Sequence, residues 1–335
     1  MTLLAHGIGG VRDLPLPDWL FLWGGALVLV LSFLLLGTLW QRPKLERTQA
    51  GRPFPQRLEA SLRSQAMRLL CGTVAVALLI LVFLTALIGE PNPSFNLAPT
   101  FVYVIFWLGV VALQVVFGNV WSVLNPWRAA ADGFAWLWGR LGLTWTPVLA
   151  YPERLGVFPA AASLFAYTVL ELTYFEPSDP RALALAIAVY SYVTWFGMAA
   201  FGRREWTEHG EGFTVYFELF ARIAPFGSHD GRLVVRAPLT GLAGADRRPG
   251  LLPFVAIMLG SVAFDGVSRS RFWQDLRFGA QGGYVVDRPW LGDAVGMAVN
   301  LGGLVGTIVL IAVAYLAAVH LARAMAARRL PLVAE

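Results

Sequence analysis

Apolar residues gather in seven long segments that are separated by short polar connections. A helix needs about 20 mainly apolar residues to cross roughly 30 Å of bilayer hydrocarbon. The sixth segment is short for this, and the seventh is long enough to tilt or to project from the membrane. The pattern predicts an all-α, polytopic transmembrane helix bundle with about seven spans. The spans are expected at residues 19–40, 69–88, 100–124, 155–174, 182–201, 251–267 and 291–321.

Two further segments mix aromatic and charged residues, which predicts amphipathic helices at the membrane surface. Residues 129–143 combine two tryptophans with Asp132 and Arg140. Residues 213–225 place four apolar side chains against Glu218 and Arg222. Interfacial helices of this kind lie with the apolar face in the lipid and the charged face in water.

The distribution of basic residues predicts the orientation of the chain in the membrane. The odd-numbered connections and the C-terminal tail hold 20 of the 26 Lys and Arg residues, and the other side holds six. Basic residues concentrate on the cytoplasmic side of a membrane protein. We therefore expect an extracytoplasmic segment over residues 1–18 and a single transmembrane domain over 19–322. Residues 202–250 form a cytoplasmic loop with the second interfacial helix, and 323–335 a cytoplasmic tail. The location expected is the bacterial inner (plasma) membrane.

Composition supports a membrane location and excludes several other classes of protein. Hydrophobic residues make up 57% of the 335 residues and charged residues 14%, against roughly 25% charged residues in soluble domains. The net charge of +5 does not indicate nucleic-acid binding, because the basic residues lie in short connections where they set topology. The lipid bilayer is the expected partner, and nucleic acid is not. Cys71 is the single cysteine, so no intrachain disulfide is expected.

A cluster of polar residues in the fifth connection is a candidate metal site. His209 and Glu211 stand two residues apart, and His229 and Asp230 follow in the same connection. A histidine with carboxylates binds a divalent metal or performs acid–base chemistry. The alternative is a polar turn whose carboxylates lie near the positive N-terminal end of the following helix.

Carboxylates within or beside the apolar segments form a second candidate site. Glu171 and Asp265 lie near the predicted outer ends of their spans, and Asp293 lies at the same level. Asn300 follows Asp293 by two helical turns on the same face. Such residues usually face a bundle interior or a watery cavity. They are candidate catalytic residues of an outward-facing pocket that binds a cation, relays protons or activates water. Alternatively, each lies at the headgroup boundary and is simply hydrated.

The sixth connection carries an unusual number of arginines for the predicted outer side. Arg269, Arg271 and Arg277 stand near Trp273. The guanidinium fork fits phosphate and carboxylate groups. We interpret the three arginines as a candidate anion-binding site, for a substrate or for lipid headgroups.

Glycines recur along the last span. Gly292 and Gly296 are four residues apart, and Gly302, Gly303 and Gly306 follow. Small residues at this spacing let helix backbones approach closely. The pattern favours tight helix packing, and a compliant helix that takes part in gating is the alternative.

Four stretches of the sequence resemble a family of bacterial multi-spanning membrane proteins labelled fenitrothion hydrolase. They are AHGIGG at residues 5–10, DLPLP at 13–17, HGEGFTVYF at 209–217 and VAFDG at 262–266. The resemblance covers most of the chain and implies a membrane-bound hydrolase, or a subunit of one, that acts on organophosphate esters. Hydrolysis of a phosphotriester needs an activated water, usually on a metal, so a divalent metal is the implied cofactor.

Three functions therefore stay open at the level of the sequence. The chain lacks a P-loop, a G-x-S-x-G elbow and an H-E-x-x-H pattern, so no standard catalytic motif selects an enzyme class. A hydrolase would bind metal. A small-solute or ion-coupled permease would show uptake that depends on Asp265. A non-catalytic membrane subunit would copurify with a partner.

Overall fold

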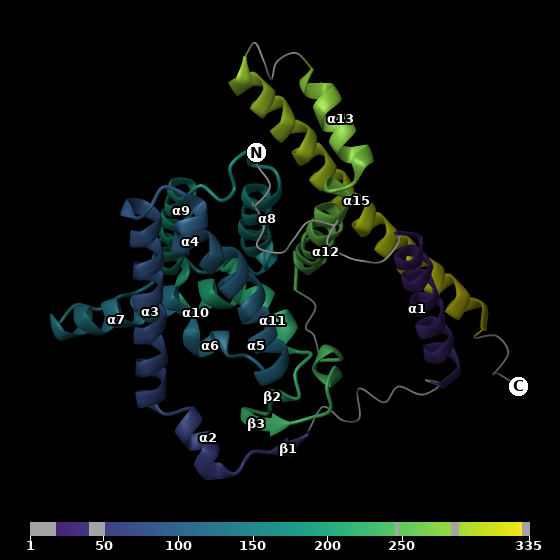
Figure 1. Ribbon diagram of the computed structural model, residues 1–335. Helices are drawn as coiled ribbons and strands as arrows, with labels where there is room; N and C mark the ends of the chain where they lie inside the picture. Colours follow the sequence, from purple (N-terminus) through teal and green to yellow (C-terminus); the bar gives the residue numbers. More distant parts are fainter. Residues whose placement is uncertain (1–17, 40–50, 245–247, 283–287, 330–335) are drawn as a thin grey trace, which may run out of the picture. The chain divides into compact units, whose positions relative to one another are not determined.

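A computed structural model describes residues 18–39, 51–244, 248–282 and 288–329, which are mainly helical (Figure 1). The chain divides into two compact units. Unit 1 comprises Met1–Ala130 and Phe217–Asp246, and unit 2 comprises Ala131–Tyr216 and Arg247–Glu335. The sequence did not predict this division, because each unit contains two segments that are distant along the chain.

Six helical stretches of the described residues are long and apolar enough to cross a membrane. Their lipid-compatible surfaces carry exposed apolar side chains such as Leu69, Leu185 and Val262, each at least 61% exposed. The predicted all-α polytopic helix bundle is confirmed. The predicted first span is helical as α1 (Asp18–Leu39), and the apolar stretch described within it is Trp23–Ser32. The six candidate spans are Gln56–Ile88, Leu97–Phe117, Glu153–Leu172, Pro180–Phe201, Leu251–Ser268 and Pro289–Ala324.

Unit 1 contains a long helix that is followed by a capped turn and then by a second, interrupted helix. The helices in order are α2 (Gln56–Leu62), α3 (Gln65–Ile88), α4 (Leu97–Thr100), the π-helix η4 (Phe101–Gly109), α5 (Val110–Phe117) and α6 (Trp121–Leu124). Ser64 caps α3 by accepting the N–H of Met67 at 3.2 Å. Asn96 caps α4, and its amide also donates to the carbonyls of Thr85 and Glu90 at 2.8 and 2.7 Å. One side chain thus closes the turn between two predicted spans.

The span predicted at residues 100–124 ends earlier than expected, at Phe117. Gly118 has a φ of +83°, which side chains other than glycine rarely adopt, and the helix stops there. The Oε1 atom of the buried Gln114 accepts the N–H groups of Val120 and Trp121, at 2.7 and 3.4 Å. The helix end is therefore satisfied inside the protein, and α6 begins afterwards as a separate turn.

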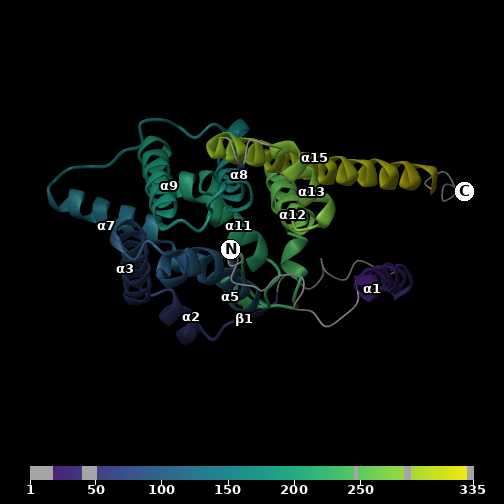
Figure 2. The same cartoon turned by 45° about the horizontal axis from the view of Figure 1, so that its top comes forward.

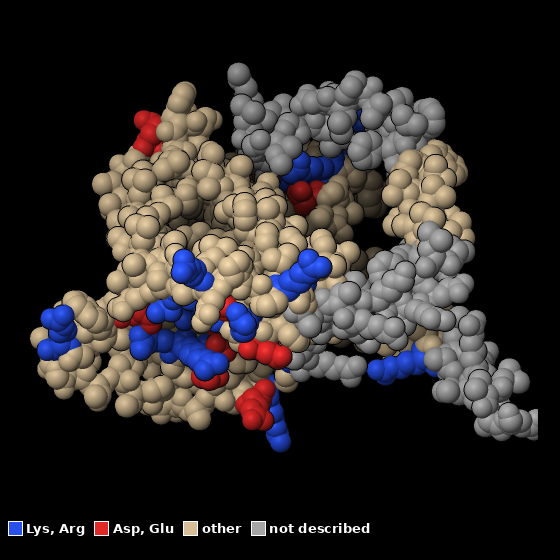
Figure 3. Space-filling view, turned by 90° about the horizontal axis from the view of Figure 1, so that it is seen from below, with Lys and Arg blue, Asp and Glu red and all other residues tan. Residues whose placement is uncertain are grey.

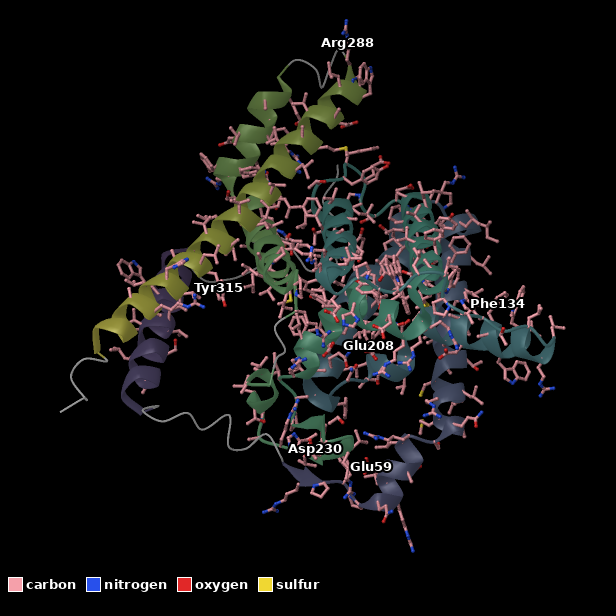
Figure 4. The ribbon with its side chains drawn as sticks, turned by 180° about the vertical axis from the view of Figure 1, so that it is seen from behind. Glu59, Phe134, Glu208, Asp230, Arg288 and Tyr315 are labelled. Carbon is pink, nitrogen blue, oxygen red and sulfur yellow. The ribbon has the colours of Figure 1, made fainter. Side chains whose placement is uncertain are left out.

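Unit 1 also contains a small antiparallel sheet that the sequence did not predict. The strands β1 (Arg52–Pro53), β2 (Phe226–His229) and β3 (Arg232–Val235) lie in the order β1-β3-β2. A two-residue turn of Asp230 and Gly231, both with positive φ, joins β2 to β3. Glu59 and Asp230 lie near this sheet (Figure 4). Because β1 belongs to the first connection and β3 to the fifth, the sheet brings these two arginine-rich connections together.

Unit 2 is an assembly of helices around α12. Its elements are α8 (Phe158–Leu172), α9 (Pro180–Phe201), α10 (Arg203–Glu205), the π-helix η6 (Trp206–Gly210), α12 (Leu251–Ser268), α13 (Arg271–Gln281) and α15 (Pro289–Arg329). Helix α12 packs against both α8 and α15, and α13 packs against α15 (Figures 1 and 2). Gly260 lies against the backbone of Ile308, and Gly303 lies against Trp273 and Phe264. The predicted close packing of the last span therefore holds at Gly303. A Cβ at Gly302 or at Gly306 would meet open space.

The two predicted surface helices form with altered bounds. The first is α7 (Pro126–Arg140), which begins at a proline as helices often do. The second is α11 (Gly212–Ala221), which ends before the predicted residue 225. Its side chains Phe213, Val215 and Tyr216 are at most 6% exposed in unit 2, and Phe217 is fully buried in unit 1. These side chains of α11 are therefore buried in protein, whereas Glu218 of the same helix is partly exposed and pairs with Arg222.

Charged side chains occupy limited parts of the surface. On the face in Figure 3, Lys, Arg, Asp and Glu form a few groups among larger areas of uncharged side chains. This distribution is the one expected when most of the remaining surface contacts lipid.

Candidate functional site

Three of the four residues predicted to line an outer pocket come together in unit 2. Glu171 lies in the last turn of α8, Asp265 near the end of α12 and Asn300 in α15. The carboxylate of Asp265 forms an ion pair with Arg269 one turn later, with Nη2 and Oδ1 3.1 Å apart. The charges of Asp265 and Arg269 both act on the Glu171 carboxyl. We refer to Glu171, Asp265, Arg269 and Asn300 as the carboxylate cluster.

Asn300 connects three helices at this cluster. Its Oδ1 accepts a hydrogen bond from the indole N–H of Trp273 in α13 at 3.0 Å. Its Nδ2 donates to the carbonyl of Leu172, the residue after Glu171, at 3.5 Å. Asn300 is 9% exposed, so these partners satisfy an amide that water barely reaches. The amide therefore holds α13 and α15 against the end of α8.

The fourth predicted residue, Asp293, takes no part in this arrangement. It is exposed near the start of α15, about 10 Å along the helix axis from Asn300 at 1.5 Å per residue. Two helical turns therefore separate Asp293 from Asn300 of the carboxylate cluster.

Tyr216 of α11 joins the carboxylate cluster from a side that sequence reasoning missed. The side chain is 5% exposed. Burial, and then the charge of Glu171, raise the pKa of the Tyr216 hydroxyl. Tyr216 therefore stays a neutral hydroxyl next to the carboxylate. The positions of Tyr216 and Glu171 along the chain do not predict this contact.

The three arginines predicted to bind an anion do not act as a group. Arg269 is paired with Asp265. The guanidinium of Arg277 lies over the ring of Phe278, 5.0 Å from its centroid, and Arg271 is exposed at the first position of α13. The predicted anion site is therefore divided between an ion pair, a cation–π contact and solvent.

Helix α13 was itself missed in the sequence, although a signal for it exists. Ser270 is its N-cap and accepts the N–H of Trp273 at 3.2 Å. At the other end Gln281 donates to the carbonyl of Gly292 at 2.8 Å. A serine followed by a mixture of apolar and charged residues is a typical helix start. The segment was not recognised because it has far fewer apolar residues than the long spans on either side.

The predicted metal ligand Glu211 caps a helix instead. Its carboxylate accepts the backbone N–H groups of Phe213 and Thr214 at 3.0 and 2.8 Å, and also the hydroxyls of Thr214 and Tyr190. The side chain is 1% exposed, and burial raises the pKa of the carboxyl above its usual range. This arrangement matches the alternative interpretation, a carboxylate at the positive end of α11.

The other predicted metal ligands lie in separate settings. The Nδ1 atom of His209 is 3.1 Å from the carbonyl oxygen of Glu205, within η6 of unit 2. His229 and Asp230 lie in the hairpin of unit 1, with Nε2 and Oδ2 3.5 Å apart. Within the described ranges, no group of three or more His, Cys, Asp or Glu side chains could hold a metal ion. The predicted four-residue metal set therefore is not assembled from the residues that the structure describes.

Glycines on both sides of Glu211 make its position possible. A Cβ at Gly210 would strike the ring of Trp206, and one at Gly212 would strike the hydroxyl of Ser163 in α8. Gly210 and Gly212 are thus required for close packing around a buried carboxylate. Tyr190 of α9 was missed, because its contact with Glu211 joins residues 21 apart in sequence.

The fold and the carboxylate cluster define the class of this protein as a polytopic, all-helical membrane protein. Comparison with protein-family models, with curated proteins and with solved structures found no match to the chain.

Proposed function

We propose that the protein moves protons across the membrane, alone or together with a solute, by means of the carboxylate cluster. The observation that carries the proposal is the charge of the cluster. Glu171 and Asp265 bring two negative charges and Arg269 brings one positive charge. One negative charge is therefore in excess among helices that are otherwise apolar.

An excess charge in this setting is unstable unless something neutralises it. Ionisable residues within membrane helices are costly, and they commonly mark proton or ion pathways. Asp265 is committed to Arg269, and the part of the chain that the structure describes gives Glu171 no ion-pair partner of its own. Glu171 is the group that takes up and releases the proton. Asp265 and Arg269 act on it as positioning residues.

Proton flux into liposomes tests this proposal directly. Purified protein is reconstituted into vesicles that contain a pH-sensitive dye, and a potassium diffusion potential drives proton entry. We expect faster internal acidification than in protein-free vesicles, and at least about a tenfold loss of this rate in Glu171→Gln. Asp293→Asn is the matched control, because it removes an exposed carboxylate of the same predicted pocket and should keep wild-type flux.

Equal flux in wild-type protein and Glu171→Gln would show that the carboxylate carries no proton. The same conclusion follows if Asp293→Asn is the only inactive variant. Orientation and amount of each variant in the vesicles are measured by accessibility of a terminal tag, so that a failure of insertion is not read as a loss of transport.

The hydrolase that the resemblance implies stays a prediction. Phosphotriester hydrolysis needs an activated water and stabilisation of a phosphoryl oxygen, usually by a metal. The carboxylate cluster offers candidates for the first requirement, and Arg269 is occupied by Asp265. Release of nitrophenol from fenitrothion by the purified protein is the measurement that tests this prediction.

A further inference from the structure

Arg236 of unit 1 has a side chain that is folded back under the hairpin of β2 and β3. Its backbone N–H donates to the carbonyl of Pro225 at 2.7 Å, directly after β3 ends. Its guanidinium lies so close to Gly227 and Gly241 that a Cβ at either position would strike it. The absence of side chains at these two positions is what allows the guanidinium to lie there.

The hydrogen bonds of this guanidinium are few and long. Nε donates to the carbonyl of Ala224 at 3.5 Å, and Nη2 donates to the carbonyl of Arg222 at 3.4 Å. A guanidinium has five N–H donors in a planar fork, and its ordinary hydrogen bonds are about 2.7–3.2 Å long. Most of the donor capacity of Arg236 is therefore unused within the described chain.

The charge of Arg236 is also uncompensated among the residues that the structure describes. Arg222 is paired with Glu218 at 2.9 Å, and its side chain is 17% exposed. No carboxylate in the described ranges lies within ion-pair distance of Arg236. Burial, and then the neighbouring charge of Arg222, lower the pKa of Arg236. Within the described ranges, the two guanidinia and one carboxylate leave one positive charge in excess in a partly buried setting.

We infer that Arg236, next to Arg222, is a binding site for a phosphate group. An anion at Arg236 neutralises the excess charge and accepts the unused N–H donors. The planar fork of arginine matches phosphate oxygens in pairs, which a single lysine charge does not. The site adjoins a sheet that joins two arginine-rich connections on one side of the membrane, where lipid phosphates also lie. The ligand is therefore a phosphate ester or phosphate ion, from a lipid headgroup or from solution.

Binding is measured with two probes that separate these sources. In nonionic detergent, inorganic phosphate is titrated while thermal unfolding is followed, with equal ionic strength kept by chloride. In nanodiscs, retention of phosphatidylglycerol is measured by native mass spectrometry against phosphatidylcholine. We expect a saturable rise in the unfolding midpoint with phosphate, or preferential retention of phosphatidylglycerol, and loss of the effect in Arg236→Gln. Arg236→Lys keeps the charge without the fork and should bind at least about fivefold more weakly.

Arg232→Gln is the matched control. Arg232 lies on β3 of the same sheet, but it is 53% exposed and already pairs with Glu59. It should respond to both probes as wild type does. A response to phosphate in solution alone assigns a soluble ligand, and retention of lipid alone assigns a headgroup. If wild-type protein responds to neither probe, or if Arg236→Gln responds like wild type, then Arg236 only caps the carbonyls of Ala224 and Arg222 and the inference is overturned.

Discussion

At the scale of single residues, a buried carboxylate is tolerated only when donors surround it, and Glu211 meets this condition. Two backbone N–H groups and two hydroxyls converge on its oxygens. Removing the acceptor takes one hydrogen bond from each of these donors, and a buried donor left unsatisfied costs about 1–3 kcal/mol. We expect Glu211→Ala to lower the free energy of unfolding by about 3 kcal/mol or more, and Glu211→Gln to lower it less. Chemical unfolding in detergent measures both.

The pH dependence of stability gives an independent measure of the same residue. Burial raises the pKa of the Glu211 carboxyl in the folded state above its unfolded value of 4.5. The contribution to stability is therefore fully present below pH 4.5 and is lost as the pH rises through the folded pKa. Relative to Glu211→Gln, which does not titrate, wild-type protein should become less stable with rising pH. A difference that stays flat across that window would show that burial does not raise the pKa.

Asn300 is the residue on which the geometry of the carboxylate cluster depends. Asn300→Leu removes the acceptor for the Trp273 indole and the donor to Leu172 while keeping a similar volume. We expect a loss of about 1–3 kcal/mol in unfolding free energy from the unpaired indole. Trp273 fluorescence should also change in the folded protein. Asn119→Leu is the control: at its exposed position it loses only the hydrogen bond from the Ser122 N–H, and it should leave Trp273 fluorescence near wild type.

At the scale of elements, the long helices follow from the sequence, and their ends do not. Apolar runs predict α3, α9, α12 and α15 because about 20 such residues satisfy both the helix and the bilayer. The end of α5 depends on the backbone conformation of Gly118 and on its close approach to the carbonyl of Phe226, a residue more than one hundred positions away. Periodicity along one chain carries no information about such a contact.

Gly118 provides the test of this view of the helix end. Gly118→Ala places a Cβ at a φ of +83° and against the Phe226 carbonyl. Strained positions of this kind cost about 1–3 kcal/mol each. We expect a drop of at least that size in stability. Gly133→Ala lies within helix α7, where a Cβ meets open space, and should be neutral or slightly stabilising. Equal effects of the two changes would contradict the assigned role of Gly118.

The candidate site was predictable only in part, because the sequence does not show contacts between residues that are distant along the chain. Carboxylates in apolar segments are conspicuous in a sequence, so Glu171 and Asp265 could be identified. Both lie near the end of a predicted span, which indicated that they lie at a similar depth in the bundle. Asp293 lies two helical turns from Asn300, and a level estimated from span ends does not resolve an offset of that size. Tyr216 and Tyr190 were missed because a tyrosine in an apolar helix gives no indication of function unless the position of its partner is known.

At the scale of the whole molecule, the arrangement of the connections tests the orientation in the membrane. The sheet pairs Pro53 of the first connection with Val234 of the fifth, so both must lie on one side. The count of 20 basic residues against six predicts that this side is the cytoplasm. Cys71 is the only native cysteine, so a Cys71→Ser background permits single labels elsewhere. Ser94 in the second connection and Ser228 in β2 are both exposed and close to cysteine in size.

We expect Ser94→Cys to react with a membrane-impermeant maleimide in intact cells, because the second connection is predicted to face the periplasm. Ser228→Cys should react only after the membrane is opened, and a reporter fused after Glu335 should read cytoplasmic. If instead Ser228→Cys reacts in intact cells and Ser94→Cys does not, the fold is retained but its orientation in the membrane is opposite to the one predicted. The Arg236 site would then lie at the outer leaflet. Reaction of both cysteines from the same side would be more serious. It would require an even number of crossings between residues 94 and 228, whereas the three candidate spans that begin with Leu97, Glu153 and Pro180 give an odd number.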